Sequence, residues 1–301
     1  MSSIDAAPLP ADDTVVGAAR SLSGDAWHDL RRSAVFWIAT ALVVLMSLIA
    51  AFPGLFSGID ARTAACSLAD SLRPPDANHW FGFDKQGCDV YSRVIYGARS
   101  SVLVGVFSTL IAGVVALFVG MLAGFYGRWI DAILARVTDV FLGIPPLLGA
   151  VVVAKALSGQ ELGIWPVVLA LGLLGWPSPA RVIRSSVIST RHQDYVNAAR
   201  ILGASNMRLM FRHILPNALA PMVVVLTIML GTFIAFEATL SFLGVGPRNT
   251  ISWGVDIAEA QRWIRDASLP LMFPAGFLTA TVLAFIMLGD AIREAFDPRL
   301  R

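Results

Sequence analysis

The stretch DYVNAARILGASNMRLMFRHILP, residues 194–216, is the longest polar segment of the chain that keeps a helical pattern. It predicts two short helices, one near Asp194–Leu202 and one near Ser205–His213, joined at Gly203. Glycine favours the left-handed conformation that ends a helix, and serine is a common cap at the start of the next one. The sequence therefore predicts a helical hairpin over residues 194–216.

Apolar segments that are long enough to cross a bilayer lie on both sides of this hairpin. Its first half carries the small residues Ala198 and Ala199, and its second half carries Arg208 and Arg212. Small side chains allow another helix to approach closely. We therefore interpret the hairpin as a docking element on the cytoplasmic face of a membrane. The alternative is a solvated loop that only connects two spans.

The composition is that of a multi-pass membrane protein. Hydrophobic residues make up 56% of the 301 residues and charged residues only 15%, whereas a soluble domain has about 25% charged residues. The net charge of +2 is too small to indicate a nucleic-acid partner. The first apolar run begins near Ala34, and it is too long for the core of a cleaved signal peptide.

Six segments are long and apolar enough to span a bilayer, since a crossing helix needs roughly 20 apolar residues. Backbone groups in lipid must form hydrogen bonds within their own segment, so the expected fold is an all-α integral membrane protein. The predicted spans are Ala34–Phe52, Ser101–Gly127, Asp131–Ala154, Leu162–Ala180, Ile214–Phe236 and Ala267–Gly289.

The spans divide the chain into segments of different character. Residues 1–33 form a polar N-terminal tail, 34–52 the first span, 53–100 the largest extracytoplasmic segment, 101–293 a five-helix core and 294–301 a C-terminal tail. If the N-terminus is cytoplasmic, more of the arginines and lysines fall on the cytoplasmic side. This positive-inside bias predicts that both termini and the hairpin lie in the cytoplasm.

Three charged residues fall within or beside predicted spans, where an unpaired charge is costly. Arg136 and Asp139 are three residues apart on one helix face. They are expected to form an ion pair with each other, or alternatively to line the inner mouth of a translocation path. Glu237 ends an apolar run. Its carboxylate is expected to bind backbone amides of the following loop, with substrate contact as the alternative.

The two cysteines, Cys66 and Cys88, both fall in the extracytoplasmic segment. A disulfide is chemically allowed outside the cytosol and would close a loop there. The alternative is a pair of free thiols. In the third span, Pro145 and Pro146 interrupt the backbone ladder and predict a kink.

The hairpin resembles the cytoplasmic loop motif of the inner-membrane subunits of ABC importers, E-A-A, three residues, G, nine residues, I-x-L-P. Here it reads Asn197-Ala198-Ala199, then Gly203, then His213-Ile214-Leu215-Pro216. The spacing holds, although asparagine replaces glutamate and histidine replaces isoleucine. Two further stretches, residues 79–99 and 237–246, resemble signatures of the dipeptide and oligopeptide permeases.

This resemblance implies a permease subunit, of the C type, of a peptide importer in the inner membrane, with the type I permease fold. It implies a heterodimer with a homologous permease subunit, two ATPase subunits that bind ATP and magnesium, and an extracytoplasmic substrate-binding protein. The residues expected to couple to the ATPase subunits are Asp194, Asn197, Ala198, Ala199, Gly203, Arg208 and Pro216. Within the family, nickel chelates, haem or another small solute are alternative cargoes.

The chain itself carries no Gly-x-x-x-x-Gly-Lys-Ser/Thr phosphate loop, so we do not expect it to hydrolyse ATP. Its four histidines are far apart in the sequence, and we expect neither a metal nor another cofactor. No nucleophile–base pattern supports a membrane enzyme. An ATP-independent channel or scaffold remains the alternative from another functional class.

Overall fold

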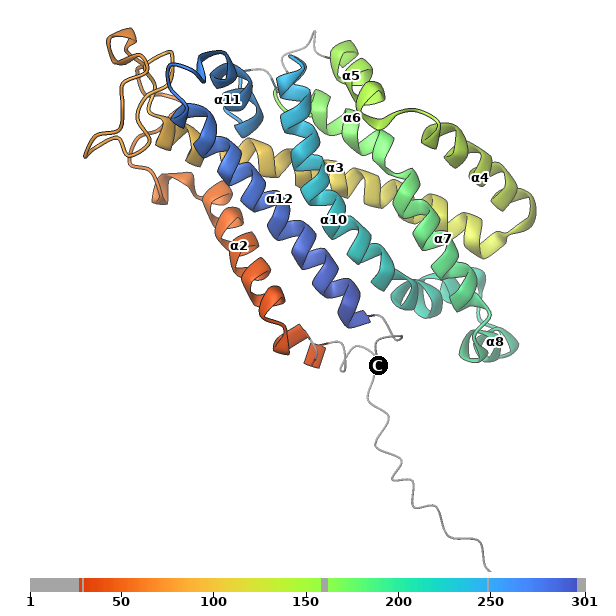
Figure 1. Cartoon of the computed structure of the whole chain (residues 1–301). Helices are drawn as coiled ribbons and strands as arrows, with labels where there is room; N and C mark the ends of the chain where they lie inside the picture. The colour runs from red at the N-terminus through yellow and green to blue at the C-terminus, as the bar shows by residue number, and fades with distance from the viewer. Residues whose placement is uncertain (1–26, 29, 158–161, 248, 297–301) are drawn as a thin grey trace, which may run out of the picture.

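The computed structural model is a slanted bundle of helices (Figure 1). It describes residues 27–28, 30–157, 162–247 and 249–296. Most of the two predicted tails, 1–33 and 294–301, lies outside these residues. Within the described part of the chain, the extended structure is limited to one isolated bridge between Phe83 and Asp89. The predicted all-α fold is confirmed.

Among the residues that the structure describes, five helices are long and apolar enough to cross a membrane, and a bent helix pair would make a sixth span. Only the first keeps its predicted bounds to within one residue, and the other four extend beyond the predicted spans at one end or both. Three of these spans are α2 (Ala34–Ala51), α3 (Val90–Tyr126) and α12 (Leu269–Phe296). A fourth consists of α6 (Trp165–Gly175) followed by α7 (Pro177–Arg191), and the fifth is Asn206–Phe242, most of which is α10 (Leu215–Phe242).

The third predicted span is not a continuous helix. It consists of α4 (Arg128–Leu142) and α5 (Pro146–Leu157), which are bent by 85° relative to one another. Pro145 and Pro146 lack backbone N–H groups, and Pro146 opens the second helix, where the missing donor is tolerated. The kink expected at these prolines is therefore a sharp break between two short helices.

The second span begins at Val90, well before the predicted Ser101. Asp89 caps this helix by accepting a hydrogen bond from the backbone N–H of Ser92. The first turns of α3 carry charged residues, which hydropathy alone assigns to the loop, but Arg93 is largely buried against other polar side chains. Burial with partners allows the helix to extend beyond its apolar stretch.

The bundle has two different ends (Figure 1). We call one the loop end, where the segment 53–89 lies beside α11 (Trp253–Ala260). We call the other the hairpin end, where α8 (Asp194–Ile201) lies. The start of α2 and the end of α12 also lie at the hairpin end, where Phe36 and Ala291 belong to one small apolar cluster. Three further short turns complete the fold: η1 (Pro53–Leu55), η2 (Leu68–Asp70) and η4 (Gln261–Trp263).

Helix α3 runs through the centre of the bundle and packs closely against α7. Gly124 of α3 allows this approach, because a Cβ atom there would lie only 2.8 Å from Cβ of Val187 and 2.9 Å from the backbone oxygen of Arg184. Val187 is completely buried at this contact. Small residues at such positions permit close helix packing in membranes. The helix that leads into the hairpin is therefore seated firmly on the central helix.

Candidate functional site

The first half of the hairpin ends in the conformation expected from the sequence. Gly203 has φ +85°, which confirms its predicted left-handed geometry. Its N–H donates to the carbonyl of Arg200 at 3.0 Å, and the N–H of Ala204 donates to the carbonyl of Ala199 at 3.0 Å. This pair of bonds is the Schellman motif, and it turns the chain sharply after α8.

The second half of the hairpin is not a separate helix, contrary to the sequence prediction. Ser205 caps a single α turn, α9 (Asn206–Arg208), by accepting from the N–H of Arg208 at 3.4 Å. The chain then continues as a π-helix, η3 (Leu209–Ile214), directly into α10. Pro216 does not break the helix because it lies in the first turn of α10. Any movement of this half is therefore passed straight into a membrane span.

The hairpin exposes an apolar surface that the sequence analysis missed. Ile201 and Leu202 are 86% and 87% exposed, and Met207 and Phe211 are also exposed. We call these four residues the hairpin patch. Exposed apolar side chains that gather on a polar segment mark an interaction site. A sequence signal was present, because the apolar pair Ile201 and Leu202 stands directly before Gly203, at the turn of an otherwise polar hairpin.

The predicted coupling residues divide between the hairpin surface and its interior. Asp194, Asn197, Ala198 and Arg208 are exposed, as is Pro216. Ala199 is instead half-buried and packs against the main apolar core. Of the two small residues predicted to permit close approach by a partner, Ala198 is therefore the one at the surface.

Two sets of hydrogen bonds fix the position and the shape of the hairpin. Arg191, in the last turn of α7, donates to the backbone carbonyls of Gly124 and Phe125 at 2.9 Å each, at the end of α3. Within the hairpin, Tyr195 donates to the carbonyl of His213 at 3.3 Å. The hairpin is thus fixed to the central helix at its base and tied across its own two halves.

The ion pair predicted between Arg136 and Asp139 does not form. Asp139 instead accepts from Arg181 of α7 at 2.6 Å, and Arg136 is exposed. A second bridge joins the same two helices, since Arg184 donates to both oxygens of Asp131 at 2.5 and 2.7 Å. Asp131 and Asp139 therefore bind α4 to α7. Asp139 pairs with Arg181 because α4 is rotated so that this side chain points towards α7.

Glu237 lies completely buried near the loop end and joins three elements. Its carboxylate accepts hydrogen bonds from the hydroxyls of Ser101 in α3 (3.0 Å), Ser241 in α10 (2.9 Å) and Ser252 at the start of α11 (2.8 Å). The prediction that backbone amides bind this carboxylate was wrong, since its partners are serine hydroxyls. The backbone N–H of Trp253 does reach the cluster, but it donates to Ser101 Oγ at 3.2 Å.

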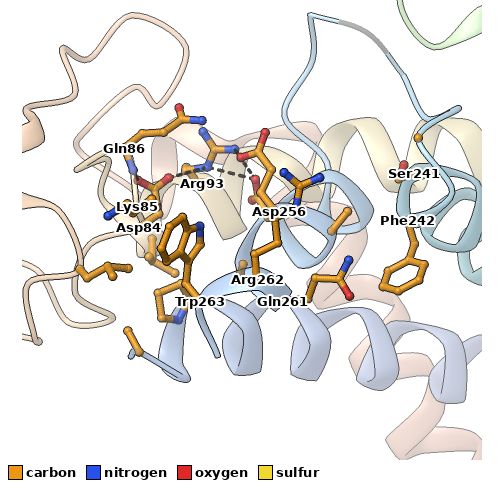
Figure 2. A pocket seen from close by; sticks show the side chains of 18 residues that line it. Asp84, Lys85, Gln86, Arg93, Ser241, Phe242, Asp256, Gln261, Arg262 and Trp263 are labelled. Carbon is orange, nitrogen blue, oxygen red and sulfur yellow. Dashed lines mark hydrogen bonds and ion pairs between the residues drawn. The ribbon is translucent and has the colours of Figure 1, made fainter. Parts of the chain in front are cut away.

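A second polar cluster lies beside the first and surrounds Arg93 (Figure 2). Arg93 donates to Asp256 Oδ1 and lies 3.4 Å from Asp84 Oδ2 and 3.7 Å from Glu259 Oε2. Burial raises the pKa of Asp256 from 3.8 to about 6, although the adjacent Arg93 guanidinium opposes the shift. The cluster joins the segment before α3, α3 itself and α11.

The segment 53–89 is held by local cross-links. Cys66 and Cys88 form a disulfide, with their Cα atoms 4.5 Å apart. His79 Nδ1 and Asp89 Oδ1 lie 3.0 Å apart at the start of α3. No group of three histidine, cysteine or carboxylate side chains within the described ranges is arranged to hold a metal ion.

Most of this chain is similar to known membrane proteins. Residues 116–301 match the family described as the binding-protein-dependent transport system inner membrane component. The chain is 34% identical to the dipeptide transport system permease protein DppC of Alkalihalophilus pseudofirmus, with 92% of this chain and 90% of that protein covered. It is 35% identical to the oligopeptide transport system permease protein OppC of Bacillus subtilis, with 93% and 91% covered.

A third relative is the glutathione transport system permease protein GsiD of Escherichia coli O6:K15:H31, at 35% identity over 100% of this chain and 97% of that protein. Among solved structures, an inward-facing MetNI methionine ABC transporter gives a TM-score of 0.56 at 20% identity. It covers 68% of this chain and 96% of that chain. The structural likeness supports the type I importer permease fold. The chain belongs to the family of binding-protein-dependent transport system inner membrane components, as a multi-pass permease of the dipeptide and oligopeptide type.

Proposed function

We propose that this chain is the permease subunit of an ATP-driven importer of short peptides. The hairpin patch carries this proposal, because it presents exposed apolar side chains on an element that continues directly into a membrane span. Relatives named for dipeptide, oligopeptide and glutathione transport support peptides as the cargo. The chain would form the translocation path with a homologous permease subunit.

We infer that the hairpin end faces the cytoplasm and docks on an ATPase subunit. The positive-inside bias of the sequence supports this orientation. Both described helix ends nearest the termini, the start of α2 and the end of α12, lie at this same end of the bundle (Figure 1). The N- and C-termini would then be cytoplasmic, and the loop end would face the extracytoplasmic binding protein.

In the proposed mechanism, closure of the ATPase pair on ATP moves the hairpin as a lever. Arg191 ties the base of the hairpin to the end of α3, and η3 continues into α10. A push on the hairpin patch would therefore tilt α3, α7 and α10 together. ATP and magnesium would be bound by the partner subunits, and this chain would supply the mechanical connection. In this reading, Asp194, Asn197, Ala198 and Arg208 form the polar border of the docking surface.

The test uses the complete complex purified from membranes and reconstituted with its binding protein. We expect two ATPase subunits and one homologous permease to copurify, and peptide uptake to require ATP. If this chain purified without ATPase subunits, or if peptide crossed the membrane without ATP, a channel or scaffold would be favoured instead. Parallel uptake assays with a nickel chelate and with haem distinguish the other cargoes of the family.

Gly203→Trp tests the lever itself. Its φ of +85° is unfavourable for most residues with a side chain, although no neighbouring atom lies within 4 Å of the position that a Cβ would occupy. We expect the variant to insert and assemble but to hydrolyse ATP without importing peptide. Gly203→Asn is the matched control, since asparagine tolerates left-handed geometry. Normal uptake by Gly203→Trp would contradict the coupling role.

A further inference from the structure

The first half of the hairpin, α8, is separated from the membrane span by two changes of backbone geometry. The chain turns at Gly203, and η3 then forms an unusually wide helical turn. In η3 the backbone N–H of Leu215 donates to the carbonyl of Met210, five residues earlier, whereas an α-helix pairs residues four apart. Turns of this π type are rare and occur frequently at functional sites.

Pro216 favours this wide turn. In a continuous α-helix the carbonyl of Arg212 would accept from the N–H of residue 216, and proline has no N–H. The wide turn fixes no unique direction for α8, because a shift of one residue in the helical register rotates the preceding segment by about 100°. Other contacts must therefore hold α8 relative to α10.

The buried side chains of the hairpin hold it against the bundle. Val196 of α8 is completely buried, as is Ile214 of η3, and both belong to the main apolar core. Apolar contact is not directional, whereas a hydrogen bond requires its donor to point at its acceptor. Hydrogen bonds are therefore the contacts that define the direction of α8 most sharply.

Three polar groups form such hydrogen bonds between the two halves of the hairpin, and we call them the His213 triangle. Asn217, at the start of α10, donates through Nδ2 to the carbonyl oxygen of His213 and to the hydroxyl of Tyr195, at 2.9 Å each. The Tyr195 hydroxyl, on α8, donates to the same carbonyl oxygen at 3.3 Å. The two amide hydrogens and the hydroxyl hydrogen all have acceptors, and the triangle joins α8 directly to η3 and α10.

The His213 triangle lies at the surface of the hairpin. Tyr195 is 44% exposed, and Asn217 is exposed as well. Neutral hydrogen bonds between groups that water also reaches add little to the free energy of unfolding. Neither residue belongs to the hairpin patch. Their hydrogen bonds thus add direction to a hairpin that buried side chains already hold in place.

We propose that Tyr195 and Asn217 are positioning residues, which lock α8 to the start of α10 through the carbonyl of His213. This inference rests on the proposed function, in which the hairpin docks on an ATPase subunit. Half of the hairpin patch lies at the end of α8. A force applied there reaches α10 by way of the His213 triangle, without passing through the turn at Gly203 and the wide turn of η3.

The first experiment measures the ATP hydrolysed per peptide imported, in the complete transporter reconstituted in liposomes with its binding protein. Tyr195→Phe keeps the ring but removes the hydroxyl, and with it two sides of the triangle. We expect the ATP cost per peptide to rise roughly 5- to 20-fold, as for the loss of two neutral hydrogen bonds, while copurification of the ATPase subunits stays as in wild type. Tyr91→Phe is the matched control, since it removes a tyrosine hydroxyl that donates to the carbonyl of Phe56 at the loop end.

Three results of this experiment would overturn the proposal. An unchanged ATP cost in Tyr195→Phe would show that the triangle does not transmit force. An equal rise in Tyr91→Phe would show a general effect of a lost hydrogen bond on the fold. Loss of ATPase copurification in Tyr195→Phe would show that the hydroxyl contacts the ATPase subunit directly.

Asn217 provides an independent variant. Asn217→Leu removes the amide and leaves only the hydrogen bond between Tyr195 and the carbonyl of His213. We expect the double variant Tyr195→Phe, Asn217→Leu to raise the ATP cost by less than the product of the two single effects, because residues of one hydrogen-bond network are coupled. A rise equal to that product would show two separate roles and overturn the triangle.

A third experiment measures the direction of α8 itself. Spin labels on Arg200→Cys in α8 and Val223→Cys in α10, both at exposed positions, report a distance distribution by pulsed electron resonance. The complex is assembled with partner subunits that carry no cysteine, and the chain's own two cysteines do not react because they form the disulfide. We expect one narrow distribution when Tyr195 is present and a broad one in Tyr195→Phe. Equal widths would contradict the positioning role.

A failure of this inference differs from a failure of the proposed function. A wild-type complex without ATP-dependent uptake would refute the proposed function. A wild-type complex that imports peptide, with Tyr195→Phe importing at the same ATP cost, would refute the positioning role alone.

Discussion

The two ends of the bundle differ in how their segments are held together. At the loop end, Glu237 accepts three hydroxyl hydrogen bonds, Arg93 meets three carboxylates and a disulfide closes the segment before α3. At the hairpin end, the hydrogen bonds serve the backbone turn and the base of the hairpin. Its most exposed apolar side chains, Ile201 and Leu202, contact little of the chain itself.

This difference indicates two kinds of surface. The loop end is built as a rigid platform, in which segments far apart in the sequence are cross-linked before any partner arrives. The hairpin end has a defined backbone that exposes apolar side chains, and the proposed ATPase partner would cover them. The following changes test this contrast, beginning with the largest expected effect.

Ile201→Asp with Leu202→Asp should break the hairpin surface without disturbing the fold. Both side chains are exposed, so the charges cost the isolated chain little, but anchors of this kind are worth about 2 kcal/mol or more each at an interface. We expect at least a 30-fold loss of ATPase copurification, and loss of uptake. Leu68→Asp makes the same change at an exposed position of the loop end. If both variants copurified equal amounts of ATPase subunit, the hairpin end would not differ from the loop end as a docking surface.

Glu237→Ala should weaken the loop end more than any single change at an exposed carboxylate. It leaves the hydroxyls of Ser101, Ser241 and Ser252 without their shared acceptor, and a cost of about 3 kcal/mol is expected for such a buried network. The thermal unfolding of purified protein measures this loss. Glu237→Gln, which retains an acceptor, should lose less, and Glu294→Ala at an exposed position should lose almost nothing. A melting curve for Glu237→Ala that matched wild type would show that the cluster does not hold α11.

Cys66→Ser with Cys88→Ser should loosen the segment 53–89. The bridge closes a loop with a sequence separation of 22 residues, which corresponds to roughly 3 kcal/mol in the chain-entropy model. Limited proteolysis should cleave this segment sooner in the variant, while the hairpin stays as resistant as in wild type. Alkylation of two thiols in native wild-type protein would contradict the bridge.

The buried carboxyl group of Asp256 should make the stability of the folded chain depend on pH. Its pKa in the folded chain is raised to about 6 from 3.8, mainly by burial. Between these two values the folded state binds more protons than the unfolded state, so stability falls as pH rises from about 4 to 6 and is level above. The effect is on the order of 3 kcal/mol, spread over about two pH units.

The melting temperature between pH 4 and 7 measures this dependence. Asp256→Asn should flatten the curve in this window, because the titrating group is gone while Arg93 keeps an acceptor. Asp76→Asn removes a half-buried carboxyl group whose pKa is lowered by the backbone N–H of Asn78, and it should leave the slope between pH 4 and 6 in place. An identical slope in wild type and Asp256→Asn would exclude Asp256 as its source.

Much of the fold follows from local signals in the sequence. Apolar runs longer than a bilayer is thick specify membrane helices wherever they lie, and a glycine after a helical face specifies a left-handed turn whatever surrounds it. Gly203 illustrates this, since the hydrogen bonds that define its turn join only residues between Ala199 and Ala204. The junction of η3 with α10 was not predicted, because hydropathy separates a polar hairpin from an apolar span even where the helix is continuous.

The partners of the charged residues depended on the tertiary structure. Arg93 and Asp256 are 163 residues apart, and Asp139 meets Arg181 instead of Arg136 on its own helix. A helical period tells which residues share a face, but not towards which neighbour that face is turned or at what depth two helices meet. By itself, the sequence determined the spans, the bend at the hairpin and the family signatures. The rotation and packing of the helices decided which charges are paired, which carboxylate is buried and which apolar side chains remain exposed.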